Sequence, residues 1–177
     1  MDALKEPSGK QDPYIGSFGG FICLDINKSG EVKVENLKIS HNVSLELNNN
    51  LLFFFTGLKR DASNVLNNQK IAIEKDKGKA IEAMHKIKEI GFQVKRALEK
   101  GDITEFGRLQ HEHWIAKRAI TKTMSNSYID QWYNLAIKNG ASGGKIMGAG
   151  GGGFLMMLHS LLRDYTTDRY KNKTLSK

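Results

Sequence analysis

The segment SGKQDPYIGSFGG, Ser8 to Gly20, holds the residues of this chain best suited to acid–base chemistry. It places the ammonium of Lys10 two residues before the carboxylate of Asp12, between glycines and next to Pro13. A carboxylate and an ammonium held together on a constrained loop can deprotonate or orient a hydroxyl group. The same composition is also typical of a polar surface loop in which Pro13 is a turn residue. The residues alone leave both interpretations open.

A second candidate is the segment KIMGAGGGGFLMML, Lys145 to Leu158, which has five glycines within six residues. Gly148, Gly150 and Gly153 satisfy the pattern G-x-G-x-x-G, which marks a dinucleotide site only where a helix follows and a βαβ unit continues. Here the apolar FLMML is typical of a strand, and the GK[ST] ending of a P-loop is absent. The spacing therefore excludes both motifs. It leaves a glycine hairpin between two packed strands, or a backbone that comes close to a ligand.

The histidines and the single cysteine predict neither a metal site nor a nucleophile. His111 and His113 lie two residues apart, so on a helix they point to opposite sides and do not form a metal pair. Cys23 lies in an apolar, strand-like run and is more typical of a core residue than of a nucleophile. We expect no metal ligands from this chain.

The 177-residue chain has the composition of a globular protein, with 40% hydrophobic and 26% charged residues. Its net charge of +8 is compatible with a nucleic-acid surface, but many lysines alternate with glutamates, as in EKDKGKAIEAMHKIKEI. That pattern is typical of solvated helix faces, so we expect no nucleic-acid partner, while an anionic small substrate remains compatible with the charge. The lack of a long apolar stretch, a signal sequence and a second cysteine favours a cytoplasmic protein without membrane contact.

The apolar pattern predicts strands first, then helices, then strands. FICLDINKSGEVKVENL is typical of a hairpin with a Lys-Ser-Gly turn centred on Gly30. LLFFFTG, Leu51 to Gly57, is a continuous apolar run and predicts a buried strand. Helical spacing extends from Asp61 to Asn139, and the glycine-rich segment then predicts two closing strands.

Within the helical region, start and stop signals divide the chain into separate helices. The apolar stripe of one long helix consists of Ala80, Ile81, Met84, Ile87, Ile90, Val94 and Leu98. Gly101 ends that helix, and Asp102 with Glu105 predicts a capping box at the start of the next. Ser127 marks the start of a further helix, and Gly140 suits the left-handed position that follows its end.

Taken together, the two glycine-containing segments resemble motifs of the GHMP kinases, the family of galactokinase, homoserine kinase and mevalonate kinase. GKQDPYIGSFGG and GGKIMGAGGGGFLMM carry this resemblance, and LLFFFTGLKRDASNVLNNQ and HEHWIAKRAI are similar to the sugar-kinase branch that acts on heptose 7-phosphate. The resemblance extends from about Pro7 to Leu158. It implies a transfer of the γ-phosphoryl group of ATP to a sugar hydroxyl, with Mg²⁺ as the accompanying cation.

The resemblance also implies roles for individual residues. Asp12 matches the catalytic aspartate of the family, and Lys10 would temper its charge or hold a substrate phosphate. The nucleotide-side loop matches Gly148, Ala149, Gly150, Gly151 and Gly152. For the sugar phosphate substrate, the expected contacts are Gln11, Tyr14 and Arg60, of which Arg60 has the guanidinium fork that suits a phosphate.

For the fold, the resemblance implies an α+β chain in three parts. Residues 1–56 would be the end of a strand-rich N-terminal domain, residues 57–160 a ferredoxin-like C-terminal domain with helices on an antiparallel sheet, and residues 161–177 an atypical basic tail. The ATP-cradling Pro-x-x-x-Gly-Leu-Gly-Ser-Ser loop of the family does not occur among the 177 residues.

Two hypotheses about function follow from this difference. In the first, the chain is the C-terminal portion of a sugar kinase that works with a complementary N-terminal kinase chain. In the second, it is a non-catalytic remnant or binding module that retains the fold. In either case the first strands would lack their partners and would expose sheet edge and apolar surface.

Overall fold

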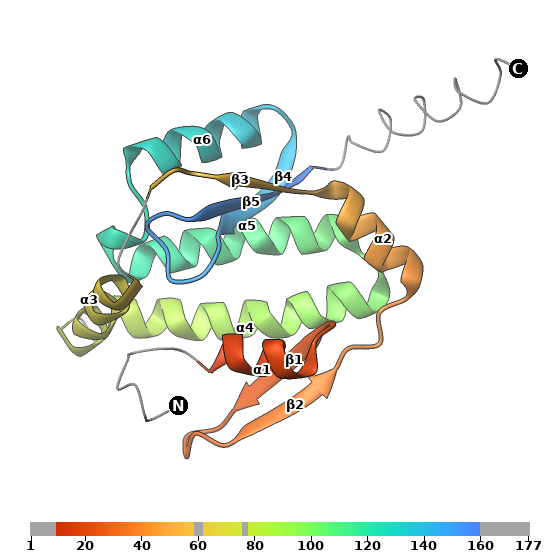
Figure 1. Cartoon of the computed structure of the whole chain (residues 1–177). Helices are drawn as coiled ribbons and strands as arrows, with labels where there is room; N and C mark the ends of the chain where they lie inside the picture. Colours follow the sequence, from red (N-terminus) through yellow and green to blue (C-terminus); the bar gives the residue numbers. More distant parts are fainter. Residues whose placement is uncertain (1–9, 59–61, 76–77, 160–177) are drawn as a thin grey trace, which may run out of the picture.

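The computed structural model describes residues 10–58, 62–75 and 78–159, and Figure 1 shows them in colour. Their helices and strands are α1 (Gln11–Phe18), β1 (Ile22–Ile26), β2 (Val32–Asn36), α2 (His41–Asn50), β3 (Leu51–Phe55), α3 (Ala62–Lys75), α4 (Lys79–Lys100), α5 (Ile103–Ile120), the 3-10 helix η1 (Lys122–Met124), α6 (Ser127–Lys138), β4 (Ala141–Ile146) and β5 (Phe154–His159). The chain is therefore α+β, as the sequence predicts.

A three-stranded antiparallel sheet in the order β3-β5-β4 forms the centre of the fold. Helix α6 covers one face of this sheet, and α5 lies against the other, with α4 beyond it (Figure 1). The register pairs Leu51 with Leu158 and Phe55 with Phe154. The sheet thus joins strands from both sides of the expected domain boundary after residue 56, and that boundary stays a prediction.

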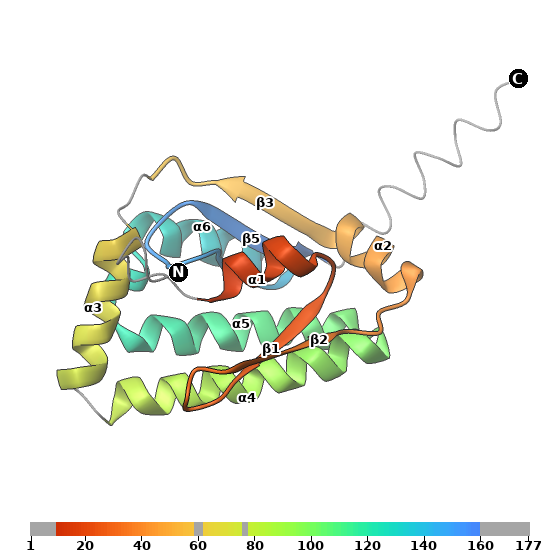
Figure 2. The same cartoon turned by 60° about the horizontal axis from the view of Figure 1, so that its bottom comes forward.

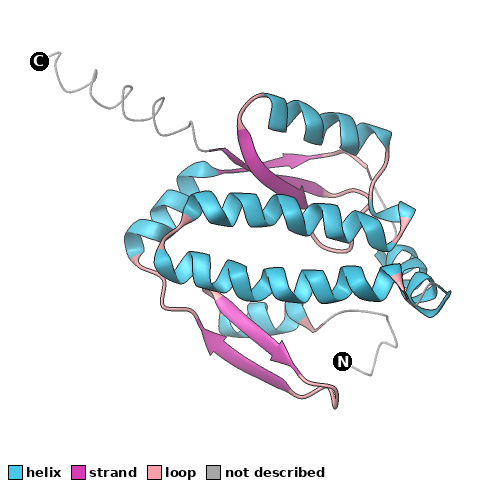
Figure 3. Ribbon diagram, turned by 180° about the vertical axis from the view of Figure 1, so that it is seen from behind, coloured by secondary structure: helices cyan, strands magenta, loops and turns pink. Residues whose placement is uncertain are grey.

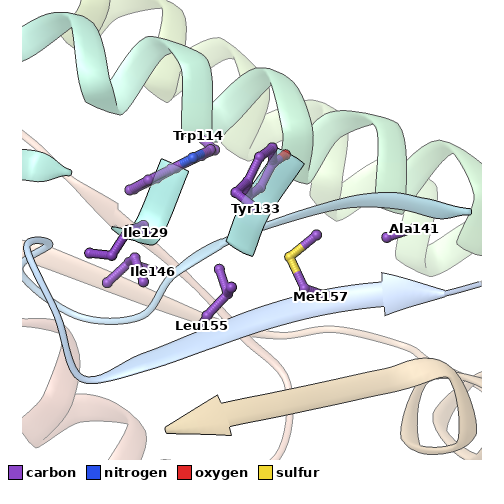
Figure 4. Close-up of a cluster of buried hydrophobic side chains, with 7 residues drawn as sticks. All are labelled: Trp114, Ile129, Tyr133, Ala141, Ile146, Leu155 and Met157. Atoms are coloured by element: carbon purple, nitrogen blue, oxygen red, sulfur yellow. The ribbon is translucent and has the colours of Figure 1, made fainter. Parts of the chain in front are cut away.

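The main core lies between α6, the sheet and the end of α5 (Figure 4). Its buried members are Trp114, Ile129, Tyr133, Ala141, Ile146, Leu155 and Met157. A second cluster ties α2 and α4 to the other face, through Leu47, Leu98, Ile103, Phe106 and Leu158. Alternate residues of β5 thus enter different clusters, as the two-residue period of a strand requires.

The long helical pair α4 and α5 confirms the start and stop signals of the sequence, and Figure 3 shows the two helices side by side. Gly101 ends α4 in the left-handed conformation, with φ 73°. Asp102 caps α5, because its carboxylate accepts a hydrogen bond from the Glu105 N–H at 2.9 Å. The Glu105 side chain does not complete a capping box, since it pairs with Arg108 instead.

Two glycines allow α5 to lie directly on β4. A Cβ atom at Gly143 would lie 2.0 Å from the Gly107 carbonyl oxygen, and one at Gly107 would lie 2.2 Å from the Ser142 Oγ. Neither distance is physically possible for a side chain, so the two backbones approach each other only because both positions are glycine. This contact fixes α5 against the strand that leads into the glycine-rich loop.

A separate two-stranded sheet is formed by β1 and β2. The expected hairpin is confirmed, with Gly30 in the left-handed conformation (φ 82°). Figure 2 shows this hairpin next to α4. The Lys95 ammonium on α4 bonds the Glu35 carboxylate on β2 at 2.6 Å, and this pair holds the Lys95 pKa above and the Glu35 pKa below its usual value.

The strand expected at LLFFFTG is present as β3, but the expectation that it is buried is wrong. Phe53, Phe54 and Phe55 are 55%, 51% and 64% exposed. β3 is the edge strand of its sheet, and within the described residues only β5 pairs with it. An apolar run has the same appearance in a buried strand and in an edge strand, so the sequence pattern did not separate the two.

Two helices were not expected from the sequence. The polar loop expected around Asp12 is helix α1, where Pro13 fits because the first-turn N–H groups of a helix have no partner within it. Helix α2 begins after Ser40, whose hydroxyl accepts a hydrogen bond from the Val43 N–H. No helix within the described ranges is long and apolar enough to cross a membrane.

Candidate functional site

Helix α1 positions the residues expected to do catalysis. Asp12 lies in its first turn and is exposed, and Gln11 beside it is exposed as well. A carboxylate is stabilised at this end of a helix by the partial positive charge of the N-terminus. Tyr14 stacks on Phe18 one turn later, with ring centroids 6.2 Å apart. The arrangement presents the Asp12 carboxylate to solvent as a proton acceptor.

Lys10 occupies the N-cap position of α1, but its side chain contacts another part of the fold. Its ammonium donates a hydrogen bond to the carbonyl oxygen of Gly30, in the turn between β1 and β2. In this conformation the ammonium links α1 to the hairpin, and the expected contact with a substrate phosphate or with Asp12 stays a prediction. The third expected substrate contact, Arg60, lies outside the described residues.

The glycine-rich segment is a hairpin loop between β4 and β5, as the strand-like FLMML predicts. The Met147 N–H donates to the Phe154 carbonyl at 2.9 Å and closes its base. The Gly151 N–H donates to the Met124 carbonyl at 2.8 Å, and the Gly153 carbonyl accepts from the Thr56 N–H at 2.9 Å. The loop is therefore attached to η1 on one side and to the end of β3 on the other.

Part of the glycine content of this loop has a packing explanation. A Cβ atom at Gly150 would lie 2.7 Å from the Met124 sulfur, and one at Gly152 would lie 2.6 Å from the Leu58 carbonyl oxygen. Gly150 also has a φ of 108°, which other residues rarely adopt. These two glycines let the loop fit against its neighbours, whatever it binds.

The same loop keeps polar backbone groups available. Within the described part of the chain, the N–H groups of Ala149, Gly150 and Gly152 make no backbone hydrogen bond. Successive N–H groups in a glycine-rich turn are suited to bind a phosphate, because they donate hydrogen bonds without adding side-chain bulk. The loop thus fits the nucleotide phosphate that the resemblance implies. No group of three or more His, Cys, Asp or Glu that could hold a metal ion occurs among the described residues.

Three further side chains near this loop were missed by the sequence argument. The Lys117 ammonium on α5 donates a hydrogen bond to the Gly148 carbonyl. Lys145 on β4 precedes the loop, and burial lowers its pKa to about 8. His113 on α5 has a pKa lowered to about 3, first by burial and then by the charges of Lys145 and Lys117. A signal was available in the motif itself, because Lys145 is the one charged residue in the segment ASGGKI that forms β4.

His111, the neighbour of His113 in the HEHW segment, has a structural role. Its Nδ1 forms a 2.7 Å hydrogen bond with the Tyr133 hydroxyl on α6. Burial raises the pKa of Tyr133 to about 12. The two histidines therefore differ in their contacts: His111 bonds Tyr133 on α6, whereas His113 lies near Lys145 and Lys117.

The two predicted halves of the site are not joined by direct contacts. Within the described ranges, no hydrogen bond or ion pair connects α1 with the glycine loop. The described residues thus supply a candidate base on α1 and a candidate phosphate loop after β4, each held by its own neighbours.

Comparison with known proteins identifies similar sequences. Residues 94–165 match the family model described as GHMP kinases C terminal. The D-glycero-alpha-D-manno-heptose 7-phosphate kinase of Campylobacter jejuni is 32% identical over 157 residues, which are 89% of this chain and 46% of that protein.

Solved structures show the same relationship. A D-glycero-D-manno-heptose 1-phosphate kinase from Bacteroides thetaiotaomicron has a TM-score of 0.61 and 30% identity over 94% of this chain and 43% of the other. A mevalonate kinase from L. major has a TM-score of 0.69 at 21% identity, over 90% of this chain and 47% of the other, and it shares the fold.

The chain spans about half the length of the heptose kinases that it matches. The matched segment includes α5, α6, β4, the glycine loop and β5, which together form the central core described above. Residues 94–165 of this chain therefore match the C-terminal domain of the GHMP kinases, and the chain is similar in sequence to sugar kinases.

Proposed function

We propose that this chain forms the C-terminal half of an ATP-dependent kinase that phosphorylates a sugar phosphate, with a heptose 7-phosphate as the preferred acceptor. The observation that supports the proposal is the combination of an exposed Asp12 at a helix N-terminus with a glycine loop in which three N–H groups make no backbone hydrogen bond within the described residues. The similarity to a heptose 7-phosphate kinase over 89% of the chain supports the choice of acceptor.

The proposed reaction is a displacement at the γ-phosphorus of ATP. The sugar hydroxyl oxygen forms the new P–O bond, the bond to the β-phosphate oxygen breaks, and ADP leaves. Asp12 orients the hydroxyl and takes its proton. Mg²⁺ would neutralise charge on the transferred group when it is bound with ATP. The chain contributes the base and a part of the phosphate surroundings, and the remaining half of the kinase would supply the other groups that position ATP.

The β1–β2 hairpin is the part of the fold most suited to join further kinase polypeptide. A sheet of two strands is marginally stable by itself, and no further strand of the described ranges pairs with either of its outer edges. Ile26 at the end of β1 is 41% exposed. A strand from the N-terminal half of a kinase, in the same or in another polypeptide, would extend this sheet and bring its nucleotide loop toward α1.

The test is a chimaera in which the N-terminal half of the Campylobacter jejuni kinase precedes this chain. With ATP, Mg²⁺ and D-glycero-D-manno-heptose 7-phosphate, the chimaera should release ADP continuously in a coupled assay. The chain alone, and the chimaera with mannose in place of the heptose phosphate, serve as controls.

A folded chimaera that releases no ADP above its no-acceptor rate contradicts the proposal. That result would favour the non-catalytic binding module. Release of ADP with several sugars but not with heptose 7-phosphate would retain the kinase and reject the acceptor.

A further inference from the structure

Helix α1, which presents Asp12, has no buried side chain to hold it in place. None of its eight residues is buried, and no side chain caps its N-terminal end. A helix of this length is marginally stable in water by itself. Its orientation therefore depends on how its two ends are attached to the rest of the chain.

The C-terminal end of α1 leads into β1 through Gly19 and Gly20. Their φ angles are 65° and 63°, and a Cβ atom at either position would meet nothing within 4 Å. Glycine restricts the backbone less than any other residue, so this joint does not fix the direction of the helix by itself. Asp12 lies roughly 10 Å from the joint along the helix axis, and a rotation of about 5° there would move its carboxylate by about 1 Å. Its placement therefore requires a second attachment, at the N-terminal end of the helix.

Lys10, at the N-cap position of α1, makes that attachment. Its ammonium donates a hydrogen bond to the carbonyl oxygen of Gly30, in the turn between β1 and β2. Within residues 10–58, 62–75 and 78–159, no other hydrogen bond or ion pair joins α1 or its N-cap to another element. The contact of Lys10 is thus the polar link that holds the end of the helix at which Asp12 lies.

The carbonyl that accepts this hydrogen bond belongs to a turn with several hydrogen bonds of its own. The Gly30 N–H donates to the Asn27 carbonyl at 3.0 Å, and the Asn27 Oδ1 accepts from the Ser29 and Glu31 N–H groups, both at 3.0 Å. A Cβ atom at position 30 would lie only 3.3 Å from the Lys10 Nζ, so the glycine also leaves room for the ammonium. The turn therefore offers Lys10 a fixed acceptor.

We propose that Lys10 is a positioning residue for Asp12. By its hydrogen bond to the Gly30 carbonyl, the ammonium fixes the N-terminal end of α1 and thereby the direction of the Asp12 carboxylate. This role differs from the two that the resemblance implies for Lys10, because the ammonium acts through the helix and not on the substrate phosphate or on the charge of Asp12. Its effect on catalysis rests on the proposed kinase function, whereas the attachment of α1 is measurable without any reaction.

The first measurement is amide hydrogen exchange of the full chain, followed by mass spectrometry of the peptide that contains α1. Lys10→Met removes the donor and should accelerate exchange in α1 about ten-fold or more, as expected for the loss of a hydrogen bond from a charged group. The control Lys28→Met removes the same charge from an exposed position of the same turn and should leave this exchange unchanged.

The second measurement is steady-state kinetics of the chimaera. Lys10→Met should lower kcat about 10- to 100-fold, because a displacement of about 1 Å in a reacting group can have an effect of this size. The KM for heptose 7-phosphate and the shape of the pH profile of kcat should stay the same. Lys10→Arg keeps a cationic donor and should recover a large part of the lost kcat, and Lys28→Met should have the kcat of the parent.

Several results would overturn the positioning role. Equal exchange of α1 in Lys10→Met and the parent, or exchange in the parent as fast as in an unfolded peptide, would show that Lys10 does not hold the helix. A raised KM for heptose 7-phosphate with unchanged kcat would assign Lys10 to the substrate phosphate. A shifted pH profile would assign it to the charge of Asp12. If Lys10→Met does not fold, Lys10→Gln takes its place in both measurements.

These outcomes are separate from those of the kinase assay. An active chimaera whose Lys10→Met variant keeps the kcat of the parent rejects the positioning role and retains the kinase. An inactive chimaera, together with faster exchange of α1 in Lys10→Met, rejects the kinase and retains the attachment of the helix by Lys10.

Discussion

At the scale of single residues, Asp12 carries the chemical part of the proposal. Its exposed carboxylate in the first turn of α1 is suited to accept a proton. In the active chimaera, Asp12→Asn should lower kcat by about 10²- to 10⁴-fold, the range expected for loss of a general base, with unchanged thermal stability. Steady-state kinetics checks this prediction.

The matched control for that variant is Asp25→Asn, on the exposed side of β1. It removes the same charge from the neighbouring hairpin and should leave kcat unchanged. Equal kcat in the Asp12→Asn variant and the parent would remove Asp12 from the mechanism.

His113 makes stability depend on pH in a defined direction. Its pKa in the folded chain is about 3, below the ordinary value of 6.5, so between these values the unfolded chain binds a proton that the folded chain does not. The free energy of unfolding should therefore fall as the pH decreases from 6.5 toward 3. Urea unfolding of His113→Asn should show a smaller fall over this range.

His85→Asn, on an exposed position of α4, is the control for the histidine prediction. It should follow the pH dependence of the parent chain. If His113→Asn follows it too, the imidazole is not held neutral by its surroundings.

At the scale of residues, the sequence singled out Asp12 and the glycine loop, and their roles stay predictions. It did not reveal that Lys145 acts electrostatically on His113. Spacing along the chain reveals motifs, whereas Lys145 and His113 come together only because α5 packs on β4. The close approach at Gly107 and Gly143 that allows this packing has no signature in either segment by itself.

At the scale of elements, the sequence correctly predicted helix ends and turns where a particular residue type is required by the backbone conformation or by a cap. Gly101 and Gly30 adopt the left-handed backbone conformation, and the Asp102 carboxylate accepts a hydrogen bond from the Glu105 N–H. The sequence failed at α1, because a glycine- and proline-containing segment resembles a loop. It also failed at the burial of β3, because exposure depends on which strands are neighbours.

Substitution of one glycine in α4 and one in α5 tests how closely these helices pack against their neighbours. At Gly91 on α4, a Cβ atom would meet nothing within 4 Å, so Gly91→Ala should stabilise the chain by about 1 kcal/mol. Gly107→Ala on α5 should destabilise it by about 1–3 kcal/mol, because its Cβ would lie 2.7 Å from the Leu158 Cδ2 and closer still to Ser142.

Denaturant unfolding of both variants is the measurement for this pair. The same substitution in two helices should have opposite signs. If both variants gain stability, α5 does not lie against β4 as closely as described.

At the scale of the whole molecule, the exposed side of β3 is the surface most suited to self-association. An apolar cavity of about 430 Å³ lies between this strand and α6, with Phe54, Trp132 and Leu135 among its lining residues. An edge strand with exposed phenylalanines invites pairing with another chain. We expect the chain alone to associate increasingly with concentration in sedimentation velocity experiments.

Phe55→Lys, at the most exposed of the three phenylalanines, should reduce this association, because a charged edge residue resists strand pairing. Leu45→Lys on α2 replaces another exposed apolar residue away from the sheet and should not. Equal effects of the two substitutions would show that the association does not use β3.

The central claim is that this chain takes part in phosphoryl transfer to a sugar phosphate. ³¹P nuclear magnetic resonance of the chimaera with ATP, Mg²⁺ and heptose 7-phosphate tests it most directly, because it observes both substrates and products. We predict that the ATP γ-phosphate signal decreases while ADP and a second sugar phosphate signal grow together, and that neither change occurs with Asp12→Asn. Free phosphate in place of the second sugar phosphate signal, or no change in the presence of a folded chimaera, would contradict the account.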